Sequence, residues 1–205
     1  MMLLAQASAM ETVPGRAFEK GDKPEGLMPE HRRVSVEGFG KLDVVDLAAW
    51  ERHFAAEPKV AGQCVTKPAG DLKNALKGEG VPKDSPLLGC PDAVAPFTVQ
   101  ARRVKAGKVE GFLFVTEHFI EDVLPSNQGL TALFQGVSAD GKTYVVGSVK
   151  VKAKGLRDEP GDLQKDAAAY KKQLAADAAM LGKLGPEDFE PNLDTLSAAL
   201  GKAQL

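Results

Sequence analysis

Apolar and polar residues alternate along several short segments of the chain, and this period of two is typical of β-strands. Residues 33–39 read RVSVEGF and residues 41–47 read KLDVVDL, so both are expected to form strands with one exposed face. The second strand runs directly into a helical pattern formed by Leu47, Trp50 and Phe54. Asp46 is suited to cap this helix, because its carboxylate accepts hydrogen bonds from the first free backbone N–H groups.

The middle of the chain contains more strands, and one of them is apolar on both faces. Residues 109–120 read VEGFLFVTEHFI, which predicts a central strand that is covered on each side. Residues 97–104 and 130–137 are expected to form two further strands. The Asp-Gly pair at 140–141 favours a hairpin turn into residues 143–154, where valines alternate with lysines.

The C-terminal part of the chain is predicted to be helical. A helix expected to start at residues 160–162 carries an apolar stripe with spacings of three and four. The stripe consists of Leu163, Ala167, Tyr170, Leu174, Ala178 and Leu181. Asp177 lies off this stripe, and Gly182 and Gly185 are expected to end the helix. Asn192 then predicts the start of a last short helix.

Length and composition indicate one globular domain. The chain has 205 residues, of which 43% are hydrophobic, close to the usual apolar fraction of about 45–50%. We expect a leader remnant and flexible linker over residues 1–30, and a single α+β domain over residues 31–205. Its strands should form a mostly antiparallel sheet of about five or six strands, with helices packed on it and a long C-terminal helix.

Charge and hydropathy exclude two classes of protein. The 26 Lys and Arg residues are balanced by 28 Asp and Glu residues, whereas a dedicated nucleic-acid binder carries a concentrated basic surface. No nucleic-acid partner is therefore expected. The sequence has no apolar run of about 18 residues, so no transmembrane helix is expected either.

The N-terminus resembles the end of an export signal. The first residues read MMLLAQASA, a short apolar stretch that ends in overlapping small-x-small triplets of the kind that signal peptidase accepts. A positively charged start and most of the apolar region are missing. We interpret residues 1–9 as the remnant of a leader cleaved after Ala9. The alternative is an ordinary frayed terminus.

The two cysteines add a second indication of export. Cys64 and Cys90 both lie beside turn-forming residues, so both are expected in loops. In an oxidising compartment they would form a disulfide worth about 3–4 kcal/mol in the loop-closure model. The alternative is two unpaired thiols. The sequence has no C-x-x-C motif, and two cysteines are too few for a cysteine-based zinc site.

One stretch is similar to a known group of proteins. Residues 127–154 read NQGLTALFQGVSADGKTYVVGSVKVKAK. This stretch resembles a family of uncharacterised bacterial extracytoplasmic proteins, often lipoproteins, in which an FQG strand, a DGK turn and a YV strand are followed by an amphipathic helix. Where that family commonly has an aromatic residue before FQG, this chain has Ala132 and Leu133. The resemblance covers roughly the C-terminal half, implies an exported domain with a lipid anchor in some members, and assigns no catalytic residue.

Residues that carry chemistry are few. The chain has three histidines and no pair of them at the spacing of a metal site, so no metal or cofactor is expected. Neither G-x-S-x-G nor S-x-x-K occurs, and no catalytic residue is assigned. His118 precedes Glu121 and Asp122, which would join it across the loop that follows the central strand. Glu117 is adjacent to His118, so the two should point to opposite faces. The alternative for this group is a set of solvated residues at a strand end.

Gln135 and Gly136 are unusual inside an apolar strand. A glycine there would let a ligand or another backbone approach closely, and the glutamine would form hydrogen bonds with it. The alternative is a β-bulge or close packing, with Gln135 bonded to neighbouring backbone. Gln135 and His118, with Glu121 and Asp122, are therefore the candidate ligand-binding residues.

Lysines and arginines gather in two places. Arg102, Arg103, Lys105 and Lys108 surround one turn, and Lys150, Lys152 and Lys154 share one face of a strand. They would form one basic patch if the two strands were neighbours. The alternative is a solvated sheet edge protected by lysine.

These features predict a non-catalytic extracytoplasmic binding or structural module of the cell envelope, located in the periplasm, at the cell surface or outside the cell. Its partner would be an unidentified protein or small molecule. One alternative is an envelope hydrolase that uses His118 with Glu121 or Asp122. Another is a small-molecule or lipid carrier, which would require an apolar cavity beneath the sheet.

Overall fold

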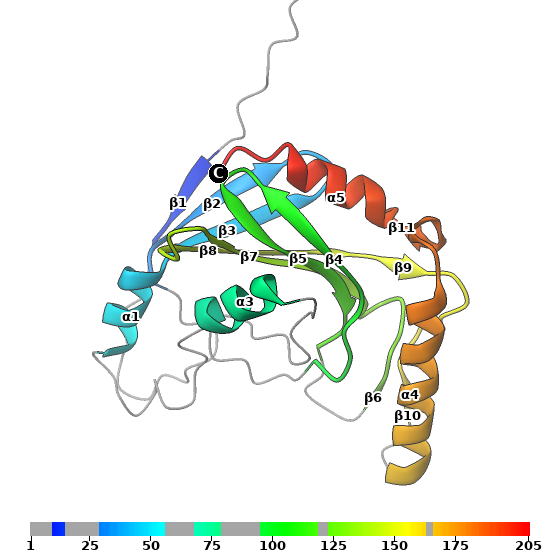
Figure 1. Ribbon diagram of the computed structural model, residues 1–205. Coiled ribbons are helices and arrows are strands. Elements are labelled where there is room, and N and C mark those ends of the chain that lie inside the picture. Colours follow the sequence, from blue (N-terminus) through cyan, green and yellow to red (C-terminus); the bar gives the residue numbers. More distant parts are fainter. Residues whose placement is uncertain (1–9, 15–28, 56–67, 79–94, 119–122, 163–165) are drawn as a thin grey trace, which may run out of the picture.

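A seven-stranded antiparallel sheet forms the centre of the molecule, as the computed structural model shows (Figure 1). The structure describes residues 10–14, 29–55, 68–78, 95–118, 123–162 and 166–205. The strand order is β1-β2-β3-β8-β7-β5-β4. These strands are β1 (Met10–Val13), β2 (His31–Val36), β3 (Gly40–Asp46), β4 (Val99–Ala106), β5 (Val109–Thr116), β7 (Thr131–Ser138) and β8 (Thr143–Lys150). The predicted α+β class is confirmed, with a slightly larger sheet than expected.

Helices cover both faces of this sheet. The described helices are α1 (Leu47–Ala55), α3 (Pro68–Lys77), α4 (Ala167–Lys183), α5 (Leu193–Gly201) and the 3₁₀ turn η1 (Pro186–Asp188). Figure 1 shows α5 across one face, which we call the first face, and α1 and α3 on the other, the second face. Two small ladders extend the structure: β6 (Val123–Leu124) pairs with β10 (Gly161–Asp162), and β9 (Lys152–Ala153) pairs with β11 (Phe189–Glu190).

Strand alternation divides the interior into two cores. On β7, Phe134 belongs to the core of the first face, whereas Leu133 belongs to the core of the second face. The long helix α4 contributes Leu181 to the first-face core. The second-face core includes Trp50 from α1 and Leu72 from α3. The prediction that the central strand is covered on both sides is confirmed, because every residue of β5 except Glu110 is buried.

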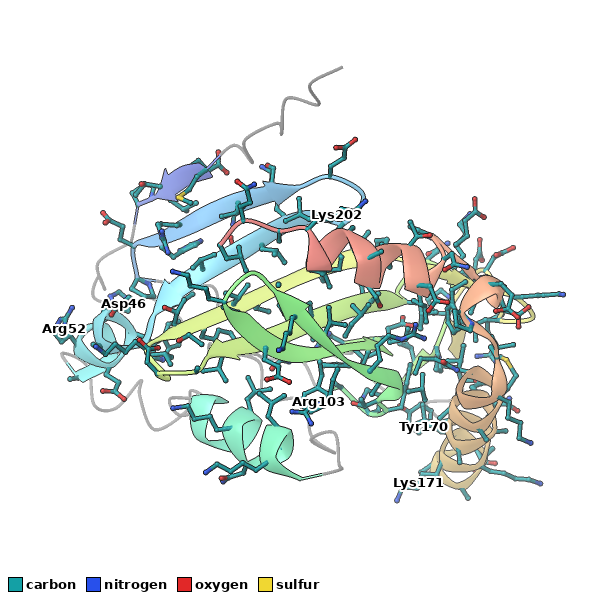
Figure 2. The ribbon with its side chains drawn as sticks, turned by 45° about the horizontal axis from the view of Figure 1, so that its top comes forward. Asp46, Arg52, Arg103, Tyr170, Lys171 and Lys202 are labelled. Atoms are coloured by element: carbon teal, nitrogen blue, oxygen red, sulfur yellow. The ribbon has the colours of Figure 1, made fainter. Side chains whose placement is uncertain are left out.

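Side-chain caps fix the starts of the helices. The Asp46 carboxylate accepts a hydrogen bond from the backbone N–H of Ala49 at 2.7 Å (Figure 2), as predicted. The side chain of Asn192 caps α5 in the same way, accepting from two backbone N–H groups. The predicted helix start at residues 160–162 is wrong. Asp166 caps α4 instead, with its Oδ1 atom 2.9 Å from the backbone nitrogen of Ala169.

Asp177 is buried, although it lies off the apolar stripe of α4. Its side chain is 8% exposed, and its carboxylate accepts two hydrogen bonds from the Arg157 guanidinium, at 2.7 Å and 3.1 Å. A buried carboxylate requires such a partner, because an unpaired charge inside a protein is strongly destabilising. The stripe alone could not reveal this, since Arg157 lies in the loop before β10.

Several predictions concern the N-terminal part and the loops. Met10–Val13 lies in the segment expected to be a linker, yet it pairs with β2 as an edge strand. Residues 1–9, Cys64 and Cys90 lie outside the described residues, so the leader and the disulfide remain predictions. Within the described part of the chain, no helix combines the length and apolar character needed to cross a membrane.

The two groups of basic residues do not form one patch. β5 and β7 separate β4 from β8 in the sheet. On β4, Arg102 forms an ion pair with Asp194 at 2.5 Å, and Arg103 forms one with Glu110 at 3.0 Å. Arg103 also donates a hydrogen bond to the carbonyl oxygen of Leu76, which ties β4 to α3 (Figure 2).

Candidate binding cavity

A cavity of about 430 Å³ opens on the second face of the sheet. We call it the His118 cavity. Its volume lies within the range of about 300–1,000 Å³ that is usual for small-molecule sites. It is lined by residues of β2, β3, β7 and β8, together with the histidine that follows β5: Arg33, Lys41, Asp43, His118, Thr131, Leu133, Val146, Gly147 and Ser148.

An ion pair forms one wall of the cavity. Arg33 and Asp43 are direct partners across β2 and β3, and the Arg33 Nε and Nη2 atoms donate to the two carboxylate oxygens at 2.6 Å and 3.3 Å. The hydrogen bond to Asp43 raises the pKa of Arg33, so the guanidinium stays charged. The Nε2 atom of the buried His31 lies 3.4 Å from the same carboxylate. Both oxygens of Asp43 are therefore already engaged by the Arg33 guanidinium.

His118 forms the opposite wall. Burial lowers the pKa of its imidazole, and the positive charge of Lys150 lowers it further. The ring is therefore neutral at pH 7, and a neutral imidazole offers one donor and one acceptor. Its Nε2 atom is buried and has no hydrogen-bond partner within the described residues. Lys150 is fixed nearby, because its ammonium group donates to the carbonyl oxygens of Gln128 and Gly129, each at 3.0 Å.

The floor of the cavity is partly apolar. Leu133 and Val146 belong to or pack against the core of the second face, so the cavity adjoins the region that α1 and α3 cover. Ser148 adds a hydroxyl group from β8. The hydroxyl of Thr131 donates to the carbonyl oxygen of Thr116 at 3.1 Å. The Oγ1 atom of Thr131 therefore remains available to accept a hydrogen bond from a ligand.

Glu117 lies beside His118 in the sequence but in different surroundings. Its side chain is 4% exposed, and its Oε2 atom accepts a hydrogen bond from the backbone N–H of Ser126 at 2.9 Å. A Cβ atom at Gly129 would lie 1.6 Å from the other carboxylate oxygen, so a larger residue there would displace the Glu117 carboxylate. Burial raises the pKa of Glu117, while the Ser126 hydrogen bond and the charges of Lys150 and Arg157 lower it.

Gln135 is fully buried on the second face and is not among the residues that line the His118 cavity. Its Oε1 atom accepts a hydrogen bond from the Tyr144 hydroxyl at 3.0 Å, so it has a side-chain partner. The pairing of β5 and β7 runs without a register shift, which excludes a bulge at Gly136. Gly136 lies opposite Gly111 instead, and a Cβ atom at Gly111 would be 2.0 Å from the Gln135 carbonyl oxygen. The two glycines let these strands approach closely.

The predicted group of His118, Glu121 and Asp122 is only partly described. His118 lines a cavity, but Glu121 and Asp122 lie outside the described residues. The cavity residues on β2, β3, β7 and β8 were not predicted from the sequence. Their one signal was the polar half of each alternating strand, and this signal does not reveal which strands become neighbours.

The described residues contain no group of three or more His, Cys, Asp or Glu side chains that would hold a metal ion. No family model, no curated protein and no solved structure matches the chain.

Proposed function

We propose that this chain is a non-catalytic binding module of the bacterial cell envelope, and that its ligand occupies the His118 cavity. The observation that carries the proposal is the lining of this cavity. An apolar floor at Leu133 and Val146 meets a charged wall at Arg33 and Lys41. Ligand sites combine apolar surface with a few convergent polar groups in this way.

The hydrogen bonding around the cavity favours binding over catalysis. Ser148, His118 and Asp43 are residue types that hydrolases use, and all three line the cavity. Nucleophilic catalysis requires a chain of hydrogen bonds from the nucleophile to the base and from the base to an orienting carboxylate. Here Arg33 occupies both oxygens of Asp43, and His118 Nε2 has no partner among the described residues.

Three sequence features support a location in the envelope. They are the leader-like residues 1–9, the pair of cysteines and the resemblance over residues 127–154. β1 begins at Met10, directly after the predicted cleavage site, so cleavage would leave the sheet complete.

Mass spectrometry of the unreduced protein tests the location. The exported protein would be purified from the envelope fraction of the bacterium that produces it, because residues 1–9 lack the charged start and most of the apolar region of a leader. We expect a chain that starts at Met10 and lacks two hydrogen atoms, because Cys64 and Cys90 are bonded. An uncleaved Met1 together with two free thiols would contradict the export argument.

Amide chemical shifts test the binding site. A set of anionic, neutral and cationic fragments would be titrated into the ¹⁵N-labelled protein. We expect some of them to shift the signals of Leu133, Val146 and Ser148 while leaving Leu196, in the first-face core, unchanged. If no fragment of any charge shifts the cavity signals, the binding proposal fails. Hydrolysis of p-nitrophenyl esters that His118→Gln abolishes would replace it with the hydrolase alternative.

A further inference from the structure

We infer that the His118 cavity selects small organic monoanions, in particular carboxylates that carry a short apolar chain. This inference rests on the proposed binding function and adds the chemical class of the ligand. It follows from the balance of charges around the cavity and from the position of the apolar floor.

The carboxylate that lines the cavity, that of Asp43, already has partners within the protein. Asp43 accepts from two nitrogen atoms of Arg33 and lies 3.4 Å from His31. A cationic ligand would have to displace these partners to reach it. Such a ligand would also face Arg33, Lys41 and the field of Lys150, so the lining disfavours positive charge.

One cation of the lining, Lys41, remains available to a ligand. Lys41 lines the cavity, and its ammonium group forms an ion pair with Glu11 on β1, at 3.6 Å. The side chains of this pair are 62% and 56% exposed, and an ion pair in that environment contributes only about 0–1 kcal/mol. A ligand carboxylate can therefore compete with Glu11 for Lys41. One loosely held cation fits one negative charge.

The apolar floor of the cavity would contact the uncharged part of the ligand. Val146 lies two residues before Ser148 on β8, and Leu133 lies opposite Ser148 on β7. Side chains two residues apart share a face of the sheet, so the apolar floor continues from the polar wall toward the second-face core. A ligand with its carboxylate at Lys41 can place an apolar chain over this floor and a hydrogen-bonding group near the neutral His118.

Three probes that share an eight-carbon chain separate charge from apolar character. Octanoate is anionic, octanamide is neutral and octylamine is cationic. Each would be titrated into the ¹⁵N-labelled protein below its micelle concentration, with the amide signals of Val146 and Ser148 and the imidazole signals of His118 as readouts. We expect octanoate to bind about threefold to fivefold more tightly than octanamide, the value of an exposed ion pair with Lys41, and octylamine to bind most weakly.

Substitutions at Lys41 test whether this lysine provides the selectivity. Lys41→Met should weaken octanoate binding by about threefold to fivefold, the value of an exposed ion pair, and leave octanamide binding unchanged. Lys41→Arg keeps the charge and should keep the affinity. Lys202→Met is the matched control, because Lys202 is exposed at the end of α5, on the other side of the sheet (Figure 2).

The outcomes distinguish this inference from the proposed function. If octanamide or octylamine moves the cavity signals at concentrations as low as octanoate does, the cavity is a binding site and the inferred anion selectivity is wrong. If octanoate leaves these signals unchanged, the inference is also wrong, and the binding proposal is then decided by the fragment titration. Equal loss of octanoate binding in the Lys41→Met and Lys202→Met variants would contradict the role given to Lys41.

Discussion

Replacing Glu117 with glutamine tests how burial acts on the residue next to His118. The Glu117 carboxylate is 4% exposed, accepts a hydrogen bond from Ser126 at 2.9 Å and lies directly against Gly129. Glutamine has nearly the same shape and keeps an oxygen that can accept the Ser126 hydrogen bond. The substitution therefore removes the buried negative charge with little change in packing.

The sign of the effect follows from the pKa of Glu117. Burial raises it above its ordinary value of 4.5, so above pH 4.5 the folded protein binds this proton more strongly than the unfolded chain does. The wild-type free energy of unfolding therefore decreases as the pH rises from 4.5 through the raised pKa, by at most about 1.4 kcal/mol per pH unit. Lys150 and Arg157 oppose this effect, because both favour the charged carboxylate.

The Glu117→Gln variant has no titratable group at position 117, so this contribution to the pH dependence of its stability is absent. Its stability should match that of the wild type near pH 4, exceed it increasingly as the pH rises, and keep a constant advantage at higher pH. For a domain of this size, about 1 kcal/mol corresponds to roughly 2–4 °C in Tm.

Trp50 provides the assay. It is the only tryptophan of the chain and is fully buried, so its fluorescence reports urea denaturation at each pH. Glu37→Gln is the matched control, because Glu37 is exposed in the turn between β2 and β3. The difference in the free energy of unfolding between this variant and the wild type should not change with pH. A Glu117→Gln variant that is equally destabilised at every pH would refute the reasoning, since burial would then not dominate the energetics of this carboxylate.

Three further predictions use the same denaturation assay or NMR. Because burial lowers the pKa of His118, its imidazole should titrate below pH 6.5 in NMR, and wild-type stability should decrease below pH 6.5 by more than that of His118→Gln; a titration above 6.5 would contradict this. Gly111→Ala should lower the free energy of unfolding by about 3 kcal/mol or more, because the new Cβ atom would lie 2.0 Å from a backbone oxygen. Gly182→Ala is the control: a Cβ atom there has no neighbour within 4 Å in helix α4, so this variant should be more stable than the wild type by about 0.5–1 kcal/mol. Equal stability of the two variants would show that β5 and β7 separate without cost. Asp166→Ala should lower the free energy of unfolding by about 1 kcal/mol through loss of the α4 cap, and Asp166→Asn should restore most of that loss.

The elements that the sequence predicts well depend on local interactions. The apolar run of β5 identifies a strand that is covered on both sides. Successive side chains point to opposite faces of the sheet, so a run of apolar residues shows that both faces are buried. Asp46 and Asn192 each bond to backbone groups within three residues of themselves. Such contacts form whatever the rest of the chain does, so a short window of sequence contains the information.

The elements that were mispredicted depend on distant partners. Residues 160–162 suit a helix start as well as a turn, and the pairing of Gly161 with Leu124 on β6 decides between them. Met10–Val13 has no strong strand pattern of its own and becomes β1 because β2 provides partners for its backbone. No local pattern distinguishes these cases, since the deciding contacts lie far away in the sequence.

The candidate site shows the same division. His118 was identified as a candidate because it precedes Glu121 and Asp122 at the end of the central strand, and it lines the cavity. The opposite wall depends on the pairing of β3 with β8, which places Asp43 opposite Val146. Arg33 and Lys41 enter the site only through that pairing. Gln135 was also a candidate, but its position on a covered part of the same face gives it a buried partner instead.

The position of the His118 cavity explains why its lining is mixed. On the second face, β5 and the adjoining part of β7 carry apolar side chains that α1 and α3 help to bury, including Phe112 and Phe114. Toward β2 and β3 the same face carries Arg33 and Asp43. The cavity lies where these two regions meet, so one side of any ligand there contacts core residues while the other side contacts charged groups. The mixed lining of the cavity is therefore a consequence of how much of this face is apolar.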